Sequence, residues 1–186
     1  REQRLGPSYY LPSLLEFEKK IKLHNPKPLR DFIHSGSSGA TPKTSESEKY
    51  YSDEENGIPF LRVQNLSPTG FLNLGNCKYI NKETHNNYLK RSQVDEHNLL
   101  VKITGVGRMA VSSVAPNDFV GNTNQHLVVI KTKDKKTSEI LASYLNTDIG
   151  EKLASRRSTG GTRPALDYPA LLSIPIIYDT KILDLY

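Results

Sequence analysis

The first periodic pattern along the chain is an apolar stripe at helical spacing within residues 11–24. Its members recur every three to four positions, at Leu11, Leu14, Leu15, Phe17 and Ile21. This spacing predicts an amphipathic helix, which Pro26 and Pro28 end. Two interpretations stay open: the helix docks on the core of its own domain, or it presents the stripe to a helical spacer or a partner protein.

Short apolar and β-branched runs follow, bounded by Gly, Asn or Pro. They lie at residues 58–63, 98–105, 108–114 and 126–131 and predict β-strands. Gly105 and Gly107 stand between the second and third runs, so these two are expected to form a hairpin. Residues 34–57 are polar, rich in Gly and Ser and without periodicity, which predicts a long loop.

The last third of the chain is predicted to be mainly helical. Residues 137–146 and 147–157 predict two helices, with Ser138 as the N-cap of the first and Asp148 at the start of the second. Asp167 and Pro169 suit the N-cap and first turn of a third, short helix. The expected fold class is α+β: a mainly antiparallel twisted sheet with peripheral helices, preceded by a helical spacer segment. Residues 1–27 form that spacer or partner segment, and residues 28–186 form one domain.

Composition narrows the class of protein further. The length of 186 residues fits one domain, and because the chain begins at Arg1 we expect a piece of a longer protein. Cys77 is the single cysteine, which excludes an internal disulfide, and no two histidines lie four positions apart, so we expect no structural metal. There is no signal-peptide pattern and no apolar run long enough to span a bilayer, so we expect a cytoplasmic chain with no membrane partner.

The charge balance favours a polyanion as partner. The formal net charge is +5, and lysine and arginine bind phosphates while releasing counterions. The excess is spread along the sequence, with no lysine-rich tail. Any basic surface must therefore be assembled by folding.

Motifs for catalysis are missing from the sequence. It contains no Walker loop, GxSxG elbow, HExxH helix or NPPY-like tetrapeptide of an adenine methyltransferase. The acidic residues within positions 46–55 fall in the expected loop, where a solvated face is the simpler explanation. We expect no catalytic residue, no metal site and no cofactor in this chain.

Polar loops carry the remaining candidate chemistry. Their cations, amides and hydroxyls can hold phosphates or read base edges, although the same residue types also serve in turns, caps and ion pairs. The candidate DNA-binding residues are Lys43, Arg62, Gln64, Arg108, Asn124, Gln125, Arg156, Arg157, Thr162 and Arg163.

Four stretches in a fixed order carry a family resemblance. "GIPFLRVQNL", "LLVKITGVGRMAV", "NTNQHLVVIK" and "ILASYLNTDIGEKLASRRSTGGTRPALDYPALLSIPI" resemble the target-recognition domain of type I restriction–modification specificity subunits and of fused type IIG enzymes. The resemblance covers residues 28–178. The chain departs from the family pattern at Lys43, where a serine is usual after GxTP, and in its hairpin, which is one residue shorter than the common ITGxIGR form.

The resemblance implies a recognition module without chemistry of its own. Such a domain reads one half of a bipartite double-stranded DNA target and assembles with DNA methyltransferase (modification) subunits and, in the restricting complex, with motor–nuclease subunits. The first alternative is the C-terminal recognition fragment of a fused restriction endonuclease–adenine methyltransferase. The others are a nuclease or methyltransferase fragment with its own activity, and an interaction domain without DNA binding. We expect the family-like motifs to serve as framework or phosphate contacts, and residues 44–55 and 68–90 to read bases.

Overall fold

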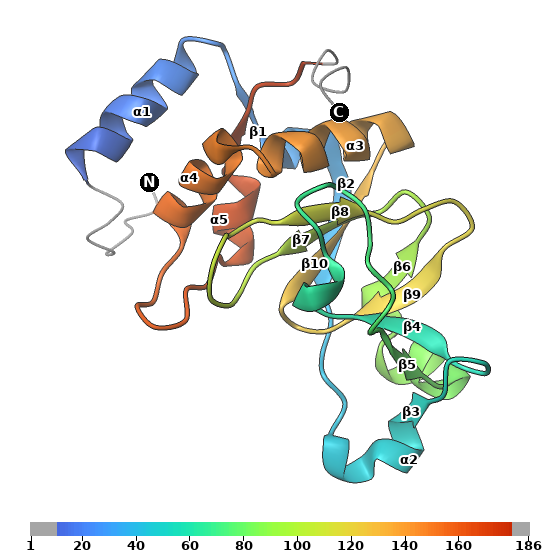
Figure 1. The fold of residues 1–186 in the computed structure, drawn as a ribbon. Helices are drawn as coiled ribbons and strands as arrows, with labels where there is room; N and C mark the ends of the chain where they lie inside the picture. Colours follow the sequence, from blue (N-terminus) through green and yellow to red (C-terminus); the bar gives the residue numbers. More distant parts are fainter. Residues whose placement is uncertain (1–10, 180–186) are drawn as a thin grey trace.

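The computed structural model describes residues 11–179, which form two packed β-sheets with helices over one of them (Figure 1). The α-helices are α1 (Pro12–Lys22), α2 (Ser47–Tyr50), α3 (Lys135–Leu145), α4 (Asp148–Arg157) and α5 (Tyr168–Leu172). The strands are β1 (Lys27–Pro28), β2 (Ile33–Ser38), β3 (Tyr51–Ser52), β4 (Ile58–Leu61), β5 (Lys78–Ile80), β6 (Gln93–Asp95), β7 (Leu99–Lys102), β8 (Ser112–Val114), β9 (Val120–Thr123), β10 (Leu127–Thr132) and β11 (Pro175–Ile176).

Short helical turns link these elements. The 3₁₀ turns are η2 (Leu29–Phe32), η3 (Thr44–Glu46), η4 (Val63–Asn65) and η6 (Lys90–Ser92), and η5 (Thr84–Tyr88) is a π-helical turn. Among residues 11–179, no helix is long and apolar enough to cross a membrane.

The strands are arranged in a four-stranded, a five-stranded and a two-stranded sheet. The four-stranded sheet has the order β2-β10-β7-β8 and is antiparallel throughout. The five-stranded sheet has the order β3-β5-β4-β9-β6, and only its β4–β9 pair is parallel. The small pair β1-β11 joins the segment after α1 to the last strand. The α+β class with mainly antiparallel pairing is confirmed, although two large sheets replace the single sheet that we predicted.

Both faces of the central strands β7 and β10 are buried. Val101 and Ile130 pack into a core shared with the helices, whereas Leu100 and Val129 pack into a second core against the five-stranded sheet. Burial on both faces requires apolar residues at consecutive positions, which explains the continuous runs in the sequence. Such runs predict strands but do not tell what covers each face, so the second sheet was not predicted.

Each of the four predicted strand segments overlaps one observed strand, with corrections at their ends. Strands β7 and β8 form the predicted hairpin, but β8 starts only at Ser112 and the preceding residues belong to the turn. Gly105 and Gly107 have φ angles of 120° and 82° in this turn, as the hairpin prediction requires. Ala110, with φ of 55°, ends any extended conformation before β8.

The prediction of one long loop over residues 34–57 is wrong in two places: η3, α2 and β3 occupy residues 44–52, and the beginning of the range forms a strand. Strand β2 occupies residues 33–38 and pairs with β10 as the edge of the four-stranded sheet. Its Gly and Ser side chains give no apolar alternation, so the sequence carries no strand pattern there. Gly36 packs beneath Tyr168, where a Cβ atom would lie 2.4 Å from the tyrosine hydroxyl oxygen.

One of the N-caps predicted for the helices in the last third of the chain is wrong. Helix α3 starts at Lys135 because Asp134, not Ser138, is its N-cap: the Asp134 carboxylate accepts a hydrogen bond from the Thr137 N–H at 2.7 Å. Ser138 lies inside the helix and donates to the His97 carbonyl oxygen. Asp167 caps α5 as predicted, since its carboxylate accepts from the Ala170 N–H at 2.7 Å.

Helix α1 lies against α4 (Figure 1). Glu18 forms ion pairs with Arg156 and Arg157, and Ile21 is buried. Leu11 and Leu15 remain 49% and 36% exposed, so only part of the predicted stripe is covered. The helix therefore docks on its own domain and still leaves an apolar edge that a partner could cover, and a separate role for residues 1–27 remains a prediction.

Candidate nucleic-acid interface

The loop after α4 closes on itself. Thr159 and Ala165 exchange two backbone hydrogen bonds of 2.8 Å, so that the residues between them form a tight turn. Gly160 has a φ of 93° there, a conformation that L side chains rarely adopt. The turn holds the exposed side chains of Thr162 and Arg163 above the domain.

This turn is tied to the β7–β8 hairpin by its main chain. The Gly105 N–H donates to the Pro164 carbonyl oxygen at 3.1 Å, and the Leu166 N–H donates to the Ile103 carbonyl oxygen at 2.8 Å. The two loops consequently lie side by side at one end of the molecule (Figure 1). Two motifs that the sequence separates by about fifty residues thus form one surface feature.

A hollow of about 280 Å³ opens beside these joined loops. It brings together segments from η4, the hairpin, the β9–β10 turn and the loop after α4. Its lining residues are Arg62, Val63, Gln64, Lys102, Thr104, Gly105, Val106, Asn124, His126 and Arg163. Arg62, Gln64, Asn124 and Arg163 are among the predicted DNA-binding residues, so the fold gathers four of them in one place.

Arg62 is held firmly at one wall of the hollow. Its backbone N–H donates to the Asn65 side-chain oxygen at 2.9 Å, and its Nη2 donates to the Asn76 carbonyl oxygen at 3.0 Å. Its Nε is buried and has no hydrogen-bond partner among the described residues. A buried guanidinium nitrogen without an acceptor is a donor whose hydrogen-bonding capacity is unsatisfied.

Arg163 lies close to His126, and both residues line the hollow. Arg163 Nη2 and His126 Nε2 are 3.5 Å apart. Burial, and then the positive charge of Arg163, lower the pKa of His126 below its ordinary value. Both effects favour the neutral form of the imidazole ring.

Replacing Arg163 with Gln should raise the pKa of His126. The substitution removes a cation that disfavours the imidazolium ion, while the burial of the ring is unchanged. Chemical shifts of the His126 ring protons measured by NMR across a pH series give this pKa directly. Arg30→Gln removes an exposed arginine that does not line the hollow and should leave the His126 titration where it is. An unchanged His126 pKa in Arg163→Gln would contradict the observed proximity of the two side chains.

Lys102 is a lining residue that our sequence reasoning missed. Only 5% of it is exposed, and its ammonium group donates to the carbonyl oxygens of Val106 and Arg108 at 2.7 and 2.9 Å. Burial lowers the pKa of this ammonium group. A lysine that ends an apolar strand usually points to solvent, and no local pattern indicates that this one turns inward beneath the hairpin.

Two further predicted residues, Gln125 and Lys43, lie near the loop formed by Gly39, Ala40, Thr41 and Pro42, which contacts the β9–β10 turn. Gln125 is exposed and accepts a hydrogen bond from the Thr41 hydroxyl at 2.5 Å. Gly39 approaches the same turn closely, because its N–H donates to the Asn124 carbonyl oxygen and a Cβ atom would collide with the Thr123 carbonyl oxygen. Lys43 is 76% exposed at the side chain and lies 3.6 Å from Glu46, outside the hollow.

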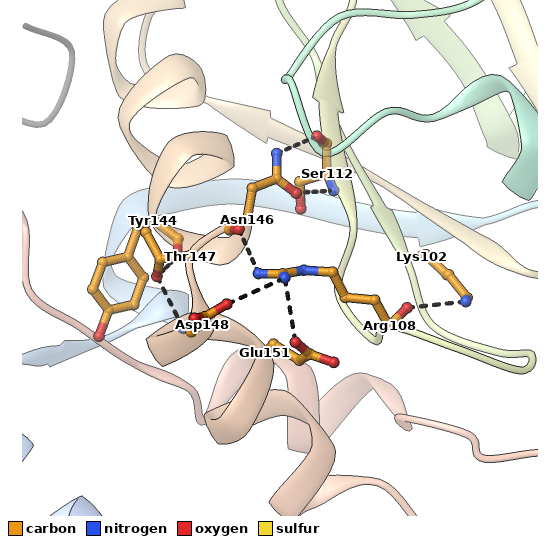
Figure 2. A network of polar contacts seen from close by, with 9 residues as sticks. Lys102, Arg108, Ser112, Tyr144, Asn146, Thr147, Asp148 and Glu151 are labelled. Atoms are coloured by element: carbon orange, nitrogen blue, oxygen red, sulfur yellow. Dashed lines mark hydrogen bonds and ion pairs between the residues drawn. The ribbon is translucent and has the colours of Figure 1, made fainter. Parts of the chain in front are cut away.

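Arg108 instead serves as an anchor for the hairpin (Figure 2). Its guanidinium group lies 3.5 Å from Asp148 and 3.3 Å from Glu151, and it also donates to the Asn146 carbonyl oxygen. Its side chain is 27% exposed. These contacts place the charge of Arg108 against the start of α4 rather than in the hollow.

Arg156 and Arg157 lie outside the hollow, at the junction of α1 and α4. Both side chains are 5% exposed and paired with Glu18 of α1. Arg157 also donates to the Leu153 carbonyl oxygen and the Ser173 hydroxyl. We therefore assign both arginines to the junction of α1 and α4 and leave them out of the interface that we propose.

Residues 44–55 and 68–90, which we expect to read bases, meet at the five-stranded sheet. Tyr50 and Tyr88 have ring centroids 5.4 Å apart, and the Asn81 side chain donates to the Lys49 carbonyl oxygen at 2.8 Å. A groove of about 360 Å³ lies between the stretches, lined by Lys49, Tyr50, Glu83, Thr84, Asn87 and Tyr88. All of these residues fall within the ranges 44–55 and 68–90.

The described part of the chain holds no cluster suited to metal binding, and its single cysteine is not activated. Within residues 11–179, no three His, Cys, Asp or Glu side chains are placed to hold a metal ion. Burial raises the pKa of the Cys77 thiol, which disfavours the reactive thiolate.

Comparison with known proteins connects this geometry to a family. A family model described as the type I restriction modification DNA specificity domain matches residues 23–178. The match begins one residue after the end of α1. No curated protein sequence matches the chain.

The solved structures that are similar to this chain have low sequence identity to it. The type IIG restriction endonuclease BpuSI is similar with a TM-score of 0.70 and 11% identity, covering 93% of this chain and 27% of that one. A chain from a type I restriction–modification system, solved to explain complex assembly and conformational transition, has a TM-score of 0.50 and 14% identity, covering 88% and 40%. The HsdS subunit from Thermoanaerobacter tengcongensis has a TM-score of 0.48 and 12% identity, covering 88% and 39%. The chain thus spans only 27% to 40% of the length of these proteins.

Proposed function

This chain belongs to the type I restriction modification DNA specificity domain family, and we propose that it reads one half of a bipartite DNA target. The observation that carries the proposal is the hollow, where Arg62 and Gln64 from one segment converge with Arg163 from a distant one. Guanidinium and amide groups of this kind hold phosphates and base edges. The hollow fixes the position of the domain on the duplex, and the groove at Tyr50 and Tyr88 reads bases.

We assign the chemistry of restriction and methylation to other polypeptide regions. In the type I arrangement, this chain guides DNA methyltransferase subunits and a motor–nuclease subunit in the cytoplasm. In a fused type IIG arrangement, it is the C-terminal recognition region of an endonuclease–adenine methyltransferase, an alternative consistent with the fold likeness to BpuSI. Both arrangements give this chain the same task on DNA.

Selection from a random duplex library tests the proposed function. A complex of the chain with its methyltransferase should enrich one defined half-site, and the purified chain should neither cleave nor methylate a plasmid with magnesium or a methyl donor. Enrichment without any shared sequence would refute target recognition. Cleavage or methylation lost on mutating one of the chain's own carboxylates would refute the assignment of chemistry elsewhere.

Asn87→Ala should weaken binding to the selected site without weakening binding to random DNA. Asn87 is exposed in the groove, and a side-chain amide that reads a base edge contributes about 1–3 kcal/mol of discrimination. Fluorescence anisotropy with the selected and a scrambled duplex at equal salt measures both affinities.

Asn86→Ala is the matched control for this measurement. Asn86 is an exposed neighbour on the same π-helical turn, but it does not line the groove. Its substitution should change neither affinity. Equal losses on both duplexes in Asn87→Ala would assign this groove to non-specific contacts.

A further inference from the structure

The hollow carries an uncompensated positive charge. Its ten lining residues include Arg62, Lys102 and Arg163 but no Asp or Glu. Within residues 11–179, no carboxylate lies at ion-pair distance from any of these three cations, whereas Arg108, Lys131 and Arg157 all have carboxylate partners. Three cations around one hollow repel one another unless an anion lies between them.

The burial of Lys102 makes the uncompensated positive charge of the hollow more destabilising. Its ammonium group has three N–H donors, and two of them point at the carbonyl oxygens of Val106 and Arg108. Neutral carbonyl oxygens satisfy donors, but they do not neutralise a charge that is only 5% exposed. A bound anion in the hollow would supply the missing negative charge and accept the remaining N–H.

We propose that the hollow is a seat for a single DNA-backbone phosphate, held between Arg62, Lys102 and Arg163. This inference rests on the function proposed above and specifies which group of the duplex enters the site. Arg62 Nε is a buried donor without a partner, and Arg163 is an exposed arm that can close over the anion. The volume of about 280 Å³ is several times the ~30 Å³ share of one liquid water, so a tetrahedral oxyanion fits.

A phosphate in the seat should also change the titration of His126, which lines the hollow. A phosphate beside His126 would offset the charge of Arg163 and stabilise the imidazolium ion. The charged residues that line the hollow together with this ring are Arg163, at 3.5 Å, Arg62 and Lys102, all of them cations. Occupation of the seat should therefore raise the pKa of His126.

Titration of the chain with inorganic phosphate tests the seat without DNA. At constant ionic strength set with chloride, backbone amide NMR signals of Thr104, Gly105, Asn124 and His126 should shift and saturate. Arg163→Gln removes one charge-assisted contact and should weaken phosphate binding roughly tenfold. Arg62→Gln should act similarly, and Arg30→Gln, an exposed arginine outside the hollow, should leave binding unchanged.

DNA measurements separate the seat from the proposed function. Arg163→Gln should weaken the selected and the scrambled duplex alike and should flatten the dependence of log affinity on log salt by about 0.9. Phosphate shifts in the hollow from a chain that binds no DNA would show an oxyanion site, but they would overturn both its assignment to the DNA backbone and the proposed function. Sequence-specific DNA binding that Arg163→Gln leaves intact, with no phosphate shifts in the hollow, would overturn the seat alone. Loss on the selected duplex only would show that Arg163 reads a base, which also overturns the seat.

Discussion

Replacing Glu18 with Gln should lower the free energy of unfolding by on the order of 3–5 kcal/mol, because it leaves buried positive charge without its carboxylate. The Glu18 side chain is 11% exposed, and the two arginine side chains that pair with it, Arg156 and Arg157, are 5% exposed. In water an ion pair contributes little, but at this depth each guanidinium has already lost most of its solvation. Urea denaturation followed by circular dichroism measures the change.

Glu16→Gln provides the control on the same helix. Glu16 lies 3.5 Å from Lys20, and both side chains are more than 70% exposed, so the loss should be about 0–1 kcal/mol. If the two variants lost the same small amount of stability, α1 would not be docked on α4 in solution. That outcome would return the opening helix to the role of a spacer independent of the domain.

Asn146→Ala should be the second strongly destabilising change, because one side chain substitutes for a missing strand partner. Its Oδ1 accepts from the Ser112 N–H at 2.9 Å, and its Nδ2 donates to the Ser112 carbonyl oxygen at 2.8 Å (Figure 2). Ser112 is fully buried, so each of its two backbone groups would be left unsatisfied, at about 1–3 kcal/mol apiece. The same denaturation experiment measures this loss.

Hydrogen exchange gives an independent reading of the same variant. The Ser112 amide should exchange faster in Asn146→Ala, because its only acceptor on the α3 side is gone. Asn56→Ala removes an exposed asparagine that bonds only locally with Asp53, and it should change stability by no more than ~0.5 kcal/mol. If the Ser112 amide remained equally protected in Asn146→Ala, a water or a backbone shift would have replaced the side chain.

The parts of the fold that the sequence predicted are those whose signal is local. The buried strands β7 and β10 are continuous apolar runs, and the hairpin between β7 and β8 needs the two glycines that the sequence places there. Strand β2 escaped prediction because an edge strand of Gly and Ser is stabilised by its partner β10, not by its own side chains. The same reason applies to the stacking of two sheets, which depends on contacts between distant segments.

The sequence predicted which types of residue form the candidate site, but not which individual residues do so. Arg163 and Arg157 stand in one short polar stretch and look equivalent as sequence, yet one is exposed and the other is buried against Glu18. The partner of Arg157 is 139 positions away, a separation that no local pattern reveals. Lys102 was missed for the opposite reason, because its two acceptors are backbone carbonyl groups, which every residue has.

The joint between the hairpin and the loop after α4 bears on how such domains could be recombined. Its bonds, Gly105 N–H to the Pro164 carbonyl and Leu166 N–H to the Ile103 carbonyl, are made by main-chain atoms alone. Most side chains near them can therefore be exchanged without breaking the joint. The groove at Tyr50 and Tyr88 is built from other segments, so under the proposed function a graft of residues 44–55 and 68–90 from a relative should change the DNA sequence that is bound while the joint stays intact. Chimeric domains with new specificities can therefore be designed by exchanging the segments of the groove and keeping the segments of the joint.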